Sequence, residues 1–500
     1  MKKIFASSVA ELDSNVYTGG GTDVTEQLQA VLDLALTEQG VHLVMDGAAL
    51  VRGLKVHSNT VIECLGSDCG FFLADYTDRP ILTNGDWSMK EIRNKDITII
   101  GGTYNHNCTK QQHDVPASEY PNPECGLTPS YKDIHRVYLM EFYGVENFKL
   151  QNVCFRNQRT YTFTMGNFKN VILEDSYIDM AEHVHPSNQD GFHLFGPGQF
   201  LTMRNLRGCT GDDFINLAPD EMDGTSSITD VLIDGICFDN VCQGIRMLSW
   251  NQGMLDRVTV RNVTGTYRTF GFSINPFFSE ESFGRYGSFY FENINLRQIK
   301  EYYHYTPLTF FQAGGDIECM VLKNVCFHSP VRNNVIFDIG TPFFYKPDEL
   351  MQEEIEKFSI DLTDYIEKDW MPPVLRPCIH TFIIDGLTVV TDEKCDDCDM
   401  IELRYSIDNV VLKNIQVFRD GEAKTSGRLV RMAKEASVKN MLVEDIFAEK
   451  LENILYAEEG HRIELLKVDN VLLRDGSRVL AVEGADIKAL VKDNVQEISL

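Results

Sequence analysis

Positive charge is scarce in this sequence of 500 residues. It contains 46 Lys and Arg residues against 74 Asp and Glu residues, which gives a formal net charge of −28. Nucleic acids and anionic membrane surfaces bind proteins through concentrated positive charge, so we expect neither as a partner. An acidic sugar would need local Arg or Lys side chains to offset the negative field of the whole protein.

Long apolar runs are absent too. No stretch approaches the roughly 18 apolar residues that read as a membrane-spanning helix. The first residues, MKKIFASSVAELDSN, reach Glu11 and Asp13 before an apolar leader segment forms. We therefore expect a cytoplasmic protein.

The cysteines lack a regular framework. There are 13 of them, an odd number without regular spacing, which indicates free thiols in a reducing compartment. Cys395 and Cys398 form a Cys-x-x-Cys pair, but no second pair accompanies them. We therefore expect no metal site and no cofactor.

Amphipathic helical periodicity is also rare, and a β-type repeat stands in its place. Short runs of alternating apolar residues recur around a central Asn or Asp. Most steps between these central residues are 25 to 31 residues long. A step of 53 residues contains a further run of this kind, residues 171–178, near its middle. A step of 61 residues is either two steps or one step with an insertion. The central residues are Asn152, Asn205, Asp234, Asn262, Asn293, Asn324, Asp385, Asn414, Asp445 and Asn470.

A period of about 30 residues made of brief β-type runs excludes βαβ units and helical repeats, and predicts an all-β stack of parallel coils. Equivalent residues of successive coils then lie about 4.8 Å apart and form ladders. Cys154, Cys237 and Cys326 occupy one slot of the repeat. We interpret them as small apolar residues stacked in the core.

The ends and insertions of the stack are also visible. Asp23 and Glu26 resemble a capping box, and Val24, Leu28, Val31, Leu32 and Ala35 form one apolar face of a helix that ends at Gly40 and caps the coils. We expect residues 1–95 to form this cap and the first coils, and 96–500 to continue the same single domain. Insertions are expected near 105–136 and 330–380.

Three carboxylates stand inside apolar, strand-like runs. Asp190 precedes the pair Asp212–Asp213 by 22 and 23 residues, and Arg246 follows Asp213 by 33. Stacked coils can bring these residues to one angular position, about 5 Å apart per step. Such a cluster suits glycosidic bond hydrolysis, in which one carboxylic acid protonates the leaving oxygen and another carboxylate activates water. Strict alternation would turn Asp212 and Asp213 to opposite faces, so a bend or bulge is expected there.

The motifs NQDG (188–191), GDD (211–213) and GIRM (244–247) resemble the catalytic series of glycoside hydrolase family 28, the polygalacturonase-like enzymes. Residues 17–35 resemble the leader of the wider pectin-active superfamily, and the resemblance covers roughly residues 15–330. It implies a right-handed parallel β-helix and an inverting hydrolase. Asp212 would be the general acid, Asp190 and Asp213 would activate the water, and Arg246 would contact the substrate.

The sequence departs from the family pattern at two points. The Gly-His-Gly motif is absent, and the family's lysine is replaced by Leu248. A preference for uronic acids is therefore not predicted, and a neutral or differently charged sugar is an alternative. His193 could replace the missing histidine. The further candidates for substrate binding are Asn188, Trp250 and Tyr303, the aromatic ones because sugar rings stack on such side chains.

Two other functions remain open at this stage. A polysaccharide lyase on the same scaffold would use Arg246 as a base and the aspartates to hold a cation. A carbohydrate-binding β-helix without catalysis would fit the missing histidine and lysine. In each case the expected partner is a carbohydrate, and a homo-oligomer is possible on the sequence alone.

Overall fold

The computed structural model describes residues 1–111, 137–182, 189–249, 252–275, 284–299, 308–329, 335–340, 378–391 and 398–498. The fold is all-β, a right-handed parallel β-helix with a capping helix near its N-terminus, as the sequence predicts. The chain divides into two compact units, Met1–Ala218 with Ile228–Val241, and Pro219–Ser227 with Cys242–Leu500. Among the described residues, no helix has the length and apolar character needed to cross a membrane.

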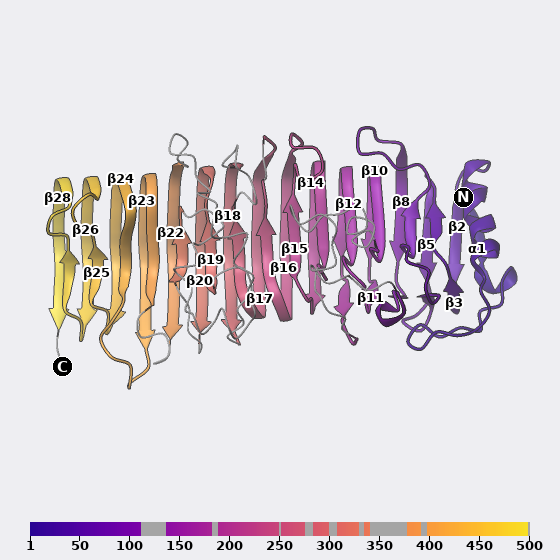
Figure 1. The fold of residues 1–500 in the computed structure, drawn as a ribbon, viewed down its shortest axis with the longest axis horizontal. Helices are drawn as coiled ribbons and strands as arrows, with labels where there is room; N and C mark the ends of the chain where they lie inside the picture. The colour runs from indigo at the N-terminus through magenta and orange to yellow at the C-terminus, as the bar shows by residue number, and fades with distance from the viewer. Residues whose placement is uncertain are drawn as a thin grey trace, which may run out of the picture. The chain divides into compact units, whose positions relative to one another are not determined.

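The first unit holds the capping helix and the strands of the chain up to Val241 (Figure 1). Its helices are the α-helix α1 (Thr25–Leu32) and three 3-10 helices (Ala6–Ser8, Asp33–Leu36 and Cys108–Lys110). Its strands are β1 (Lys2–Phe5), β2 (Val41–Met45), β3 (Ala48–Val51), β4 (Leu54–Val56), β5 (Thr60–Cys64), β6 (Gly70–Leu73), β7 (Leu82–Asn84), β8 (Asn94–Ile100), β9 (Thr103–Asn105), β10 (Met140–Gln151), β11 (Cys154–Arg156), β12 (Phe163–Glu174), β13 (Tyr177–Asp179), β14 (Phe192–Gly208), β15 (Asp213–Ala218) and the greater part of β16 (Ile228–Met247).

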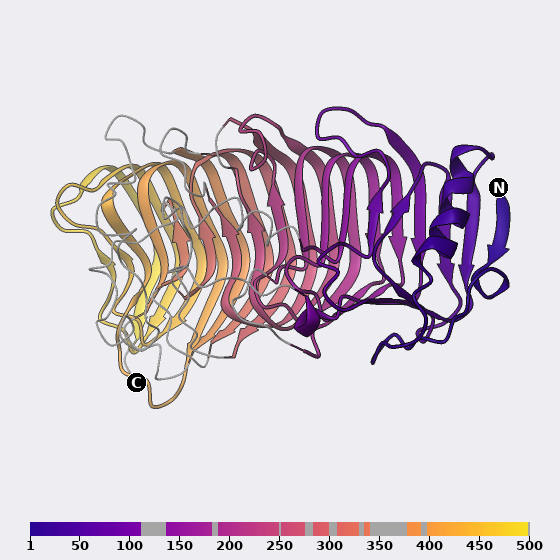
Figure 2. The ribbon, with the colours of Figure 1, turned by 45° about the vertical axis from the view of Figure 1, so that its right-hand side comes forward.

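Three parallel sheets make up the first unit, and its coils are seen obliquely in Figure 2. Sheet A runs through β4, β7, the first residues of β10, β12 and β14, and then β15. Sheet B runs through β1, β2, β5, β8 and the later residues of β10, β12 and β14 to β16. Sheet C runs through β3, β6, β9, β11, β13 and the ends of β14 and β16.

The second unit continues the repeat with parallel pairing throughout its described strands. One ladder joins β17, β18, β20, β22, β23, β24, β26 and β28, and a second joins β17, β19, β21, β23, β24, β25 and β27. The strands are β17 (Met254–Ile274), β18 (Arg285–Gln298), β19 (Thr309–Ala313), β20 (Asp316–Ser329), β21 (Val335–Ile339), β22 (Cys378–Thr391), β23 (Asp399–Arg419), β24 (Arg428–Glu449), β25 (Asn453–Tyr456), β26 (Arg462–Arg474), β27 (Arg478–Ala481) and β28 (Asp486–Ile498).

Inward-facing aromatic and aliphatic side chains fill the coils. In sheet A, Met140, Phe163, Phe192 and Ile215 stand in register on successive strands, and all four are fully buried. The ring centroids of Phe163 and Phe192 are 6.1 Å apart. This apolar column fixes the register of sheet A, because a slip of one residue would turn each of these side chains outward.

The repeated Asn and Asp residues mark sharp bends of the coil. Eight of the ten repeat positions have φ between 50 and 58°, and at the other two, 234 and 385, the following Gly235 and Gly386 take the positive φ. Asn and Gly tolerate this left-handed conformation best. The amide of Asn324 donates to Asn293 Oδ1 at 3.3 Å, and that of Asn293 donates to Asn262 Oδ1 at 3.1 Å. The long step before Asp385 is one step with an insertion, because β20 pairs directly with β22.

The capping helix is shorter than predicted. Helix α1 ends at Leu32 and a 3-10 turn follows, so the regular helix does not continue to Gly40. Asp23 accepts a hydrogen bond from the backbone N–H of Thr25 at 3.0 Å, whereas Glu26 makes no capping contact. Leu28 is fully buried where α1 packs against β2 and β4, but Ala35 is only partly covered.

The cysteine slot faces outward, which corrects its interpretation as core. Cys154 is partly exposed and Cys237 is exposed. Cys154 and Cys237 do share one ladder of sheet C, together with Tyr177 and Arg207. Their neighbours Phe155 and Phe238 point inward instead. The predicted insertions lie largely outside the described residues, which omit 112–136 and 341–377.

Candidate functional site

Asp190 and Asp213 stand side by side where the chain enters sheet A. Phe192 pairs with Ile215, so Asp190 and Asp213, each two residues earlier, occupy the same rung. The backbone N–H of Gly191 donates to the carbonyl of Asp213 at 2.8 Å, which confirms the alignment. Their strands are therefore one inter-strand spacing apart, about 4.8 Å. Both aspartates are buried.

Each of these aspartates contacts the side chain three residues further on. Asp190 Oδ2 lies 2.8 Å from Nδ1 of His193, and Asp213 Oδ2 accepts from the amide of Asn216 at 3.2 Å. A carboxylate can only accept, so Nδ1 of His193 carries the proton in this bond. His193 and Asn216 are paired in register and face away from the core column. Both carboxylates therefore reach the outward face of sheet A.

Asp212 precedes the strand. Strand β15 begins at Asp213, so Asp212 lies in the bend before it, and the strict alternation that would separate the pair does not apply. Thr210 Oγ1 donates to the carbonyl of Asp212 at 2.9 Å, and the N–H of Gly211 donates to the carbonyl of Gln189 at 3.2 Å. These bonds hold the bend against the preceding coil, with Asp212 7% exposed.

Aromatic rings pack around His193, the partner of Asp190. The rings of Tyr161 and His193 are stacked with centroids 4.4 Å apart, and Tyr138 stacks on Tyr161 at 4.9 Å. The centroid of Phe195 lies 4.6 Å from that of His193. The sequence-based prediction missed Tyr138 and Tyr161, although Tyr161 stands two residues before Phe163, the same offset that Asp190 has before Phe192. Alignment of the repeats at sheet A would have found it.

Several polar atoms around the site are buried without a protein partner in the part of the chain that the structure describes. They include Oγ1 of Thr164 and Oδ1 of Asn216, which flank His193 on neighbouring strands of sheet A. Both ends of the Gln158 amide and Oε1 of Gln189 are also unpartnered. Burying such groups without a bond is costly. These side chains can therefore donate hydrogen bonds to, and accept them from, a ligand rich in hydroxyl groups.

A buried histidine lies in the loop layer between sheets C and A. Nδ1 of His106 accepts from the backbone N–H of Arg159 at 3.0 Å, and Nε2 lies 3.2 Å from the carbonyl of Arg79, to which it donates. Burial lowers the pKa of His106 to about 3, because an imidazolium ion would lose its hydration there. His106 is thus a neutral structural group.

Of the predicted substrate-binding residues other than His193, only Arg246 lies within the described residues. Arg246 belongs to the second unit, where it is 2% exposed, bonds to Gln243 Oε1 and lies with its guanidinium carbon 5.2 Å from the centroid of the Phe270 ring. Asn188, Trp250 and Tyr303 lie outside the described residues. Their predicted contacts with substrate stay predictions.

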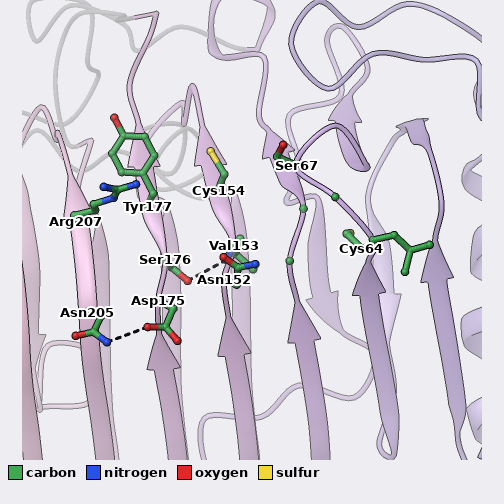
Figure 3. A pocket seen from close by; sticks show the side chains of 14 residues that line it. Cys64, Ser67, Asn152, Val153, Cys154, Asp175, Ser176, Tyr177, Asn205 and Arg207 are labelled. Carbon is green, nitrogen blue, oxygen red and sulfur yellow. Dashed lines mark hydrogen bonds between the residues drawn. The ribbon is translucent and has the colours of Figure 1, made fainter.

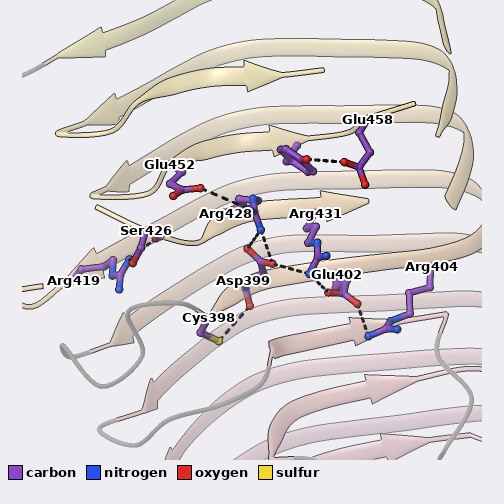
Figure 4. Close-up of polar contacts among 11 residues, drawn as sticks. Cys398, Asp399, Glu402, Arg404, Arg419, Ser426, Arg428, Arg431, Glu452 and Glu458 are labelled. Atoms are coloured by element: carbon purple, nitrogen blue, oxygen red, sulfur yellow. Dashed lines mark hydrogen bonds and ion pairs between the residues drawn. The ribbon is translucent and has the colours of Figure 1, made fainter. Parts of the chain in front are cut away.

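A second cluster of charges lies within the second unit (Figure 4). Asp399 accepts from Arg428 Nη1 at 3.2 and 3.3 Å, and Arg431 Nη1 lies 3.6 Å from Asp399 and 3.3 Å from Glu402. Arg404 pairs with Glu402 as well. Burial raises the pKa of Asp399 although both arginines act to lower it. Because acids and bases alternate and bind one another, we interpret this cluster as a structural ion network.

One group of side chains has the spacing of metal ligands. The ligand atoms of Cys378, His380 and Asp408 all lie within 4.8 Å of one another. His380 Nδ1 is 2.9 Å from Asp408 Oδ2, while Lys439 Nζ is 2.7 Å from the other carboxylate oxygen. The lysine competes with a cation for Asp408, and His380 is half exposed. These contacts account for the group as a surface ion cluster.

Comparisons with known proteins give fold likeness only. No family model and no curated protein matches the sequence. Similar solved structures include the tailspike of Escherichia coli bacteriophage HK620 (TM-score 0.49, 10% identity, 95% of this chain and 75% of the tailspike). They also include the family 28 exopolygalacturonase of Yersinia enterocolitica (TM-score 0.47, 13% identity, 99% and 78%) and an exopolygalacturonase of Thermotoga maritima (TM-score 0.46, 14% identity, 94% and 91%).

Proposed function

We propose that the protein is an inverting glycoside hydrolase that cleaves a glycosidic bond in an oligo- or polysaccharide. The observation that carries the proposal is the placement of Asp190 and Asp213 on one rung of sheet A with Asp212 beside them. Inverting hydrolysis needs a carboxylic acid that protonates the leaving oxygen and a carboxylate that activates a water molecule. Three buried carboxylates on two successive coils provide both groups.

In this proposal Asp190 and Asp213 hold the attacking water between them, since they are neighbours on one rung. Asp212, which lies in the bend before the strand, protonates the oxygen of the departing sugar. His193 is a positioning residue: its bond to Asp190 fixes the orientation of that carboxylate, and the stacked ring of Tyr161 fixes the imidazole. Thr164 and Asn216 are placed to bind sugar hydroxyls, because their oxygen atoms have no other partner among the described residues.

The test is an assay of the purified protein on a panel of uronic and neutral oligosaccharides, with and without EDTA. New reducing ends and ultraviolet absorbance are followed in parallel. We expect reducing ends without absorbance, unaffected by EDTA. The variant Asp212→Asn should lose activity by about 10²- to 10⁴-fold, because an amide cannot supply the proton. Product configuration, followed by NMR, should show inversion at the anomeric carbon.

Asp445→Asn is the matched control, since it makes the same chemical change at a ladder position that is Asn in other coils, and should keep full activity. Ultraviolet absorbance that requires a cation would identify a lyase and overturn the proposal. Sugar binding without turnover across the panel, equal in the protein and in Asp212→Asn, would identify a carbohydrate-binding protein instead.

A further inference from the structure

A pocket of about 530 Å³ lies on the outward face of sheet C in the first unit (Figure 3). Its volume is in the range of small-molecule sites. Cys154, Tyr177 and Arg207 line it from three successive strands of one ladder, and Asn152 and Ser67 line it from adjacent bends. These residues are distinct from the aspartates at the entrance to sheet A.

Arg207 is the basic residue of the pocket. It is exposed, its guanidinium carbon lies 5.1 Å from the centroid of the Tyr177 ring, and among the described residues no carboxylate pairs with it. It gives the pocket a positively charged group in a chain whose net charge is −28. A guanidinium held against an aromatic ring keeps its N–H edge available to a carboxylate.

The acid of the pocket does not neutralise Arg207. Asp175 already accepts hydrogen bonds from the amide of Asn205 at 3.0 Å and from the amide of Gln151 at 3.3 Å. Figure 3 shows the bond between Asp175 and Asn205 below the row that carries Tyr177 and Arg207. Asp175 keeps its negative charge, but these bonds direct its oxygen atoms to the two amides, and among the described residues it forms no ion pair with Arg207.

The remaining lining suits a ligand with many hydroxyl groups. Within the described structure the side-chain amide of Asn152 makes no hydrogen bond to another ladder residue, whereas that of Asn205 does. The hydroxyl groups of Tyr177 and Ser67 also have no hydrogen-bond partner among the described residues. These groups offer both donors and acceptors around an open recess. The floor is bare backbone at Gly101 and Gly102, where Cβ atoms would collide with Cys64.

We propose that this pocket binds a carboxylate-bearing sugar, with the carboxylate on Arg207 and the ring hydroxyls on Asn152, Tyr177 and Ser67. The proposed role of this pocket is to bind the sugar without cleaving it. The proposal therefore goes beyond the proposed hydrolysis and does not depend on it. Such a site would hold an acidic stretch of polysaccharide on a face of the coils away from the three aspartates.

Affinity electrophoresis tests the proposal. Native gels contain polygalacturonate or, in parallel, a neutral polysaccharide, and every sample carries Asp212→Asn so that the matrix is not cleaved. We expect retardation in the polygalacturonate gel alone, and Arg207→Gln should weaken the apparent binding by about tenfold, because a charge-assisted hydrogen bond is lost. Arg204→Gln removes the same charge from an exposed position of β14 outside the pocket and should bind like the parent.

Three results would overturn the proposal. Equal retardation of Arg207→Gln and Arg204→Gln would place the binding elsewhere, and equal retardation in the neutral gel would remove the role of the carboxylate. Competition by inorganic phosphate at the same concentration as galacturonate would show a general anion site. Thermal unfolding of each variant checks that all are folded. Since no step measures cleavage, failure here leaves the proposed hydrolysis untouched, and failure of hydrolysis leaves this result untouched.

Discussion

His106 shows how a single buried residue sets a pH dependence of the whole protein. Its pKa is about 3 in the folded state, because of burial, and 6.5 for an ordinary histidine. Between these pH values the unfolded chain binds a proton that the folded chain refuses, so stability falls as the pH falls. From pH 7 to pH 5 this one group removes about 2 kcal/mol of stability.

The variant His106→Gln should lose this dependence. The denaturant midpoint is measured at pH 7 and at pH 5. The difference between the two midpoints should be smaller in His106→Gln than in the parent protein, whatever the variant's stability at pH 7. An unchanged difference in His106→Gln would contradict the assignment of the neutral ring.

At the same scale, the register of Asp190 with Asp213 is predictable from the repeat alone, because parallel coils align equivalent positions. The partners of these carboxylates were harder to find. Tyr161 lies outside the recognised motifs, and only its position two residues before Phe163 connects it with the site. The position shared by Cys154 and Cys237 was wrongly assigned to the core. Side chains of a strand alternate between the inward and the outward face, and the sequence does not show which set points inward in sheet C unless the position of the preceding bend is known.

Among the elements, the bends carry a second testable feature. Asn293 combines a φ of 57° with hydrogen bonds to Asn262 and Asn324. Asn293→Gly should lose the two hydrogen bonds, which contribute at most about 0.5–1.5 kcal/mol each at this exposed position. Asn293→Ala should lose about 1 kcal/mol more, because an L side chain other than Asn disfavours the left-handed region.

Chemical denaturation of the two variants at one pH measures both effects. Equal midpoints for Asn293→Gly and Asn293→Ala would mean that the backbone relaxes out of the left-handed region at no cost. The bends were predictable as elements, since Asn recurs at fixed spacing. The end of α1 was not, because the apolar helical pattern runs on to Ala35 whereas the α-helix gives way to a 3-10 turn after Leu32.

For the whole molecule, the net charge of −28 predicts a salt dependence. Unpaired like charges repel in the folded state, and dissolved ions screen this repulsion over about 10 Å at 0.1 M ionic strength. The thermal unfolding temperature should therefore rise by a few degrees between about 20 and about 300 mM NaCl. KCl should act like NaCl if screening is the cause. A falling temperature would show that attractive pairs such as those around Asp399 dominate instead.

The steps that separate the rung partners of sheet A are unequal. From Tyr138 to Tyr161 there are 23 residues, from Tyr161 to Asp190 there are 29, and from Asp190 to Asp213 there are 23. The strands nevertheless stay in register, so the surplus residues are confined to the connections between sheets. During evolution, therefore, a connection between sheets of the first unit can gain or lose residues and so change the surface that it forms. The distance between the strands that carry Asp190 and Asp213 stays the same.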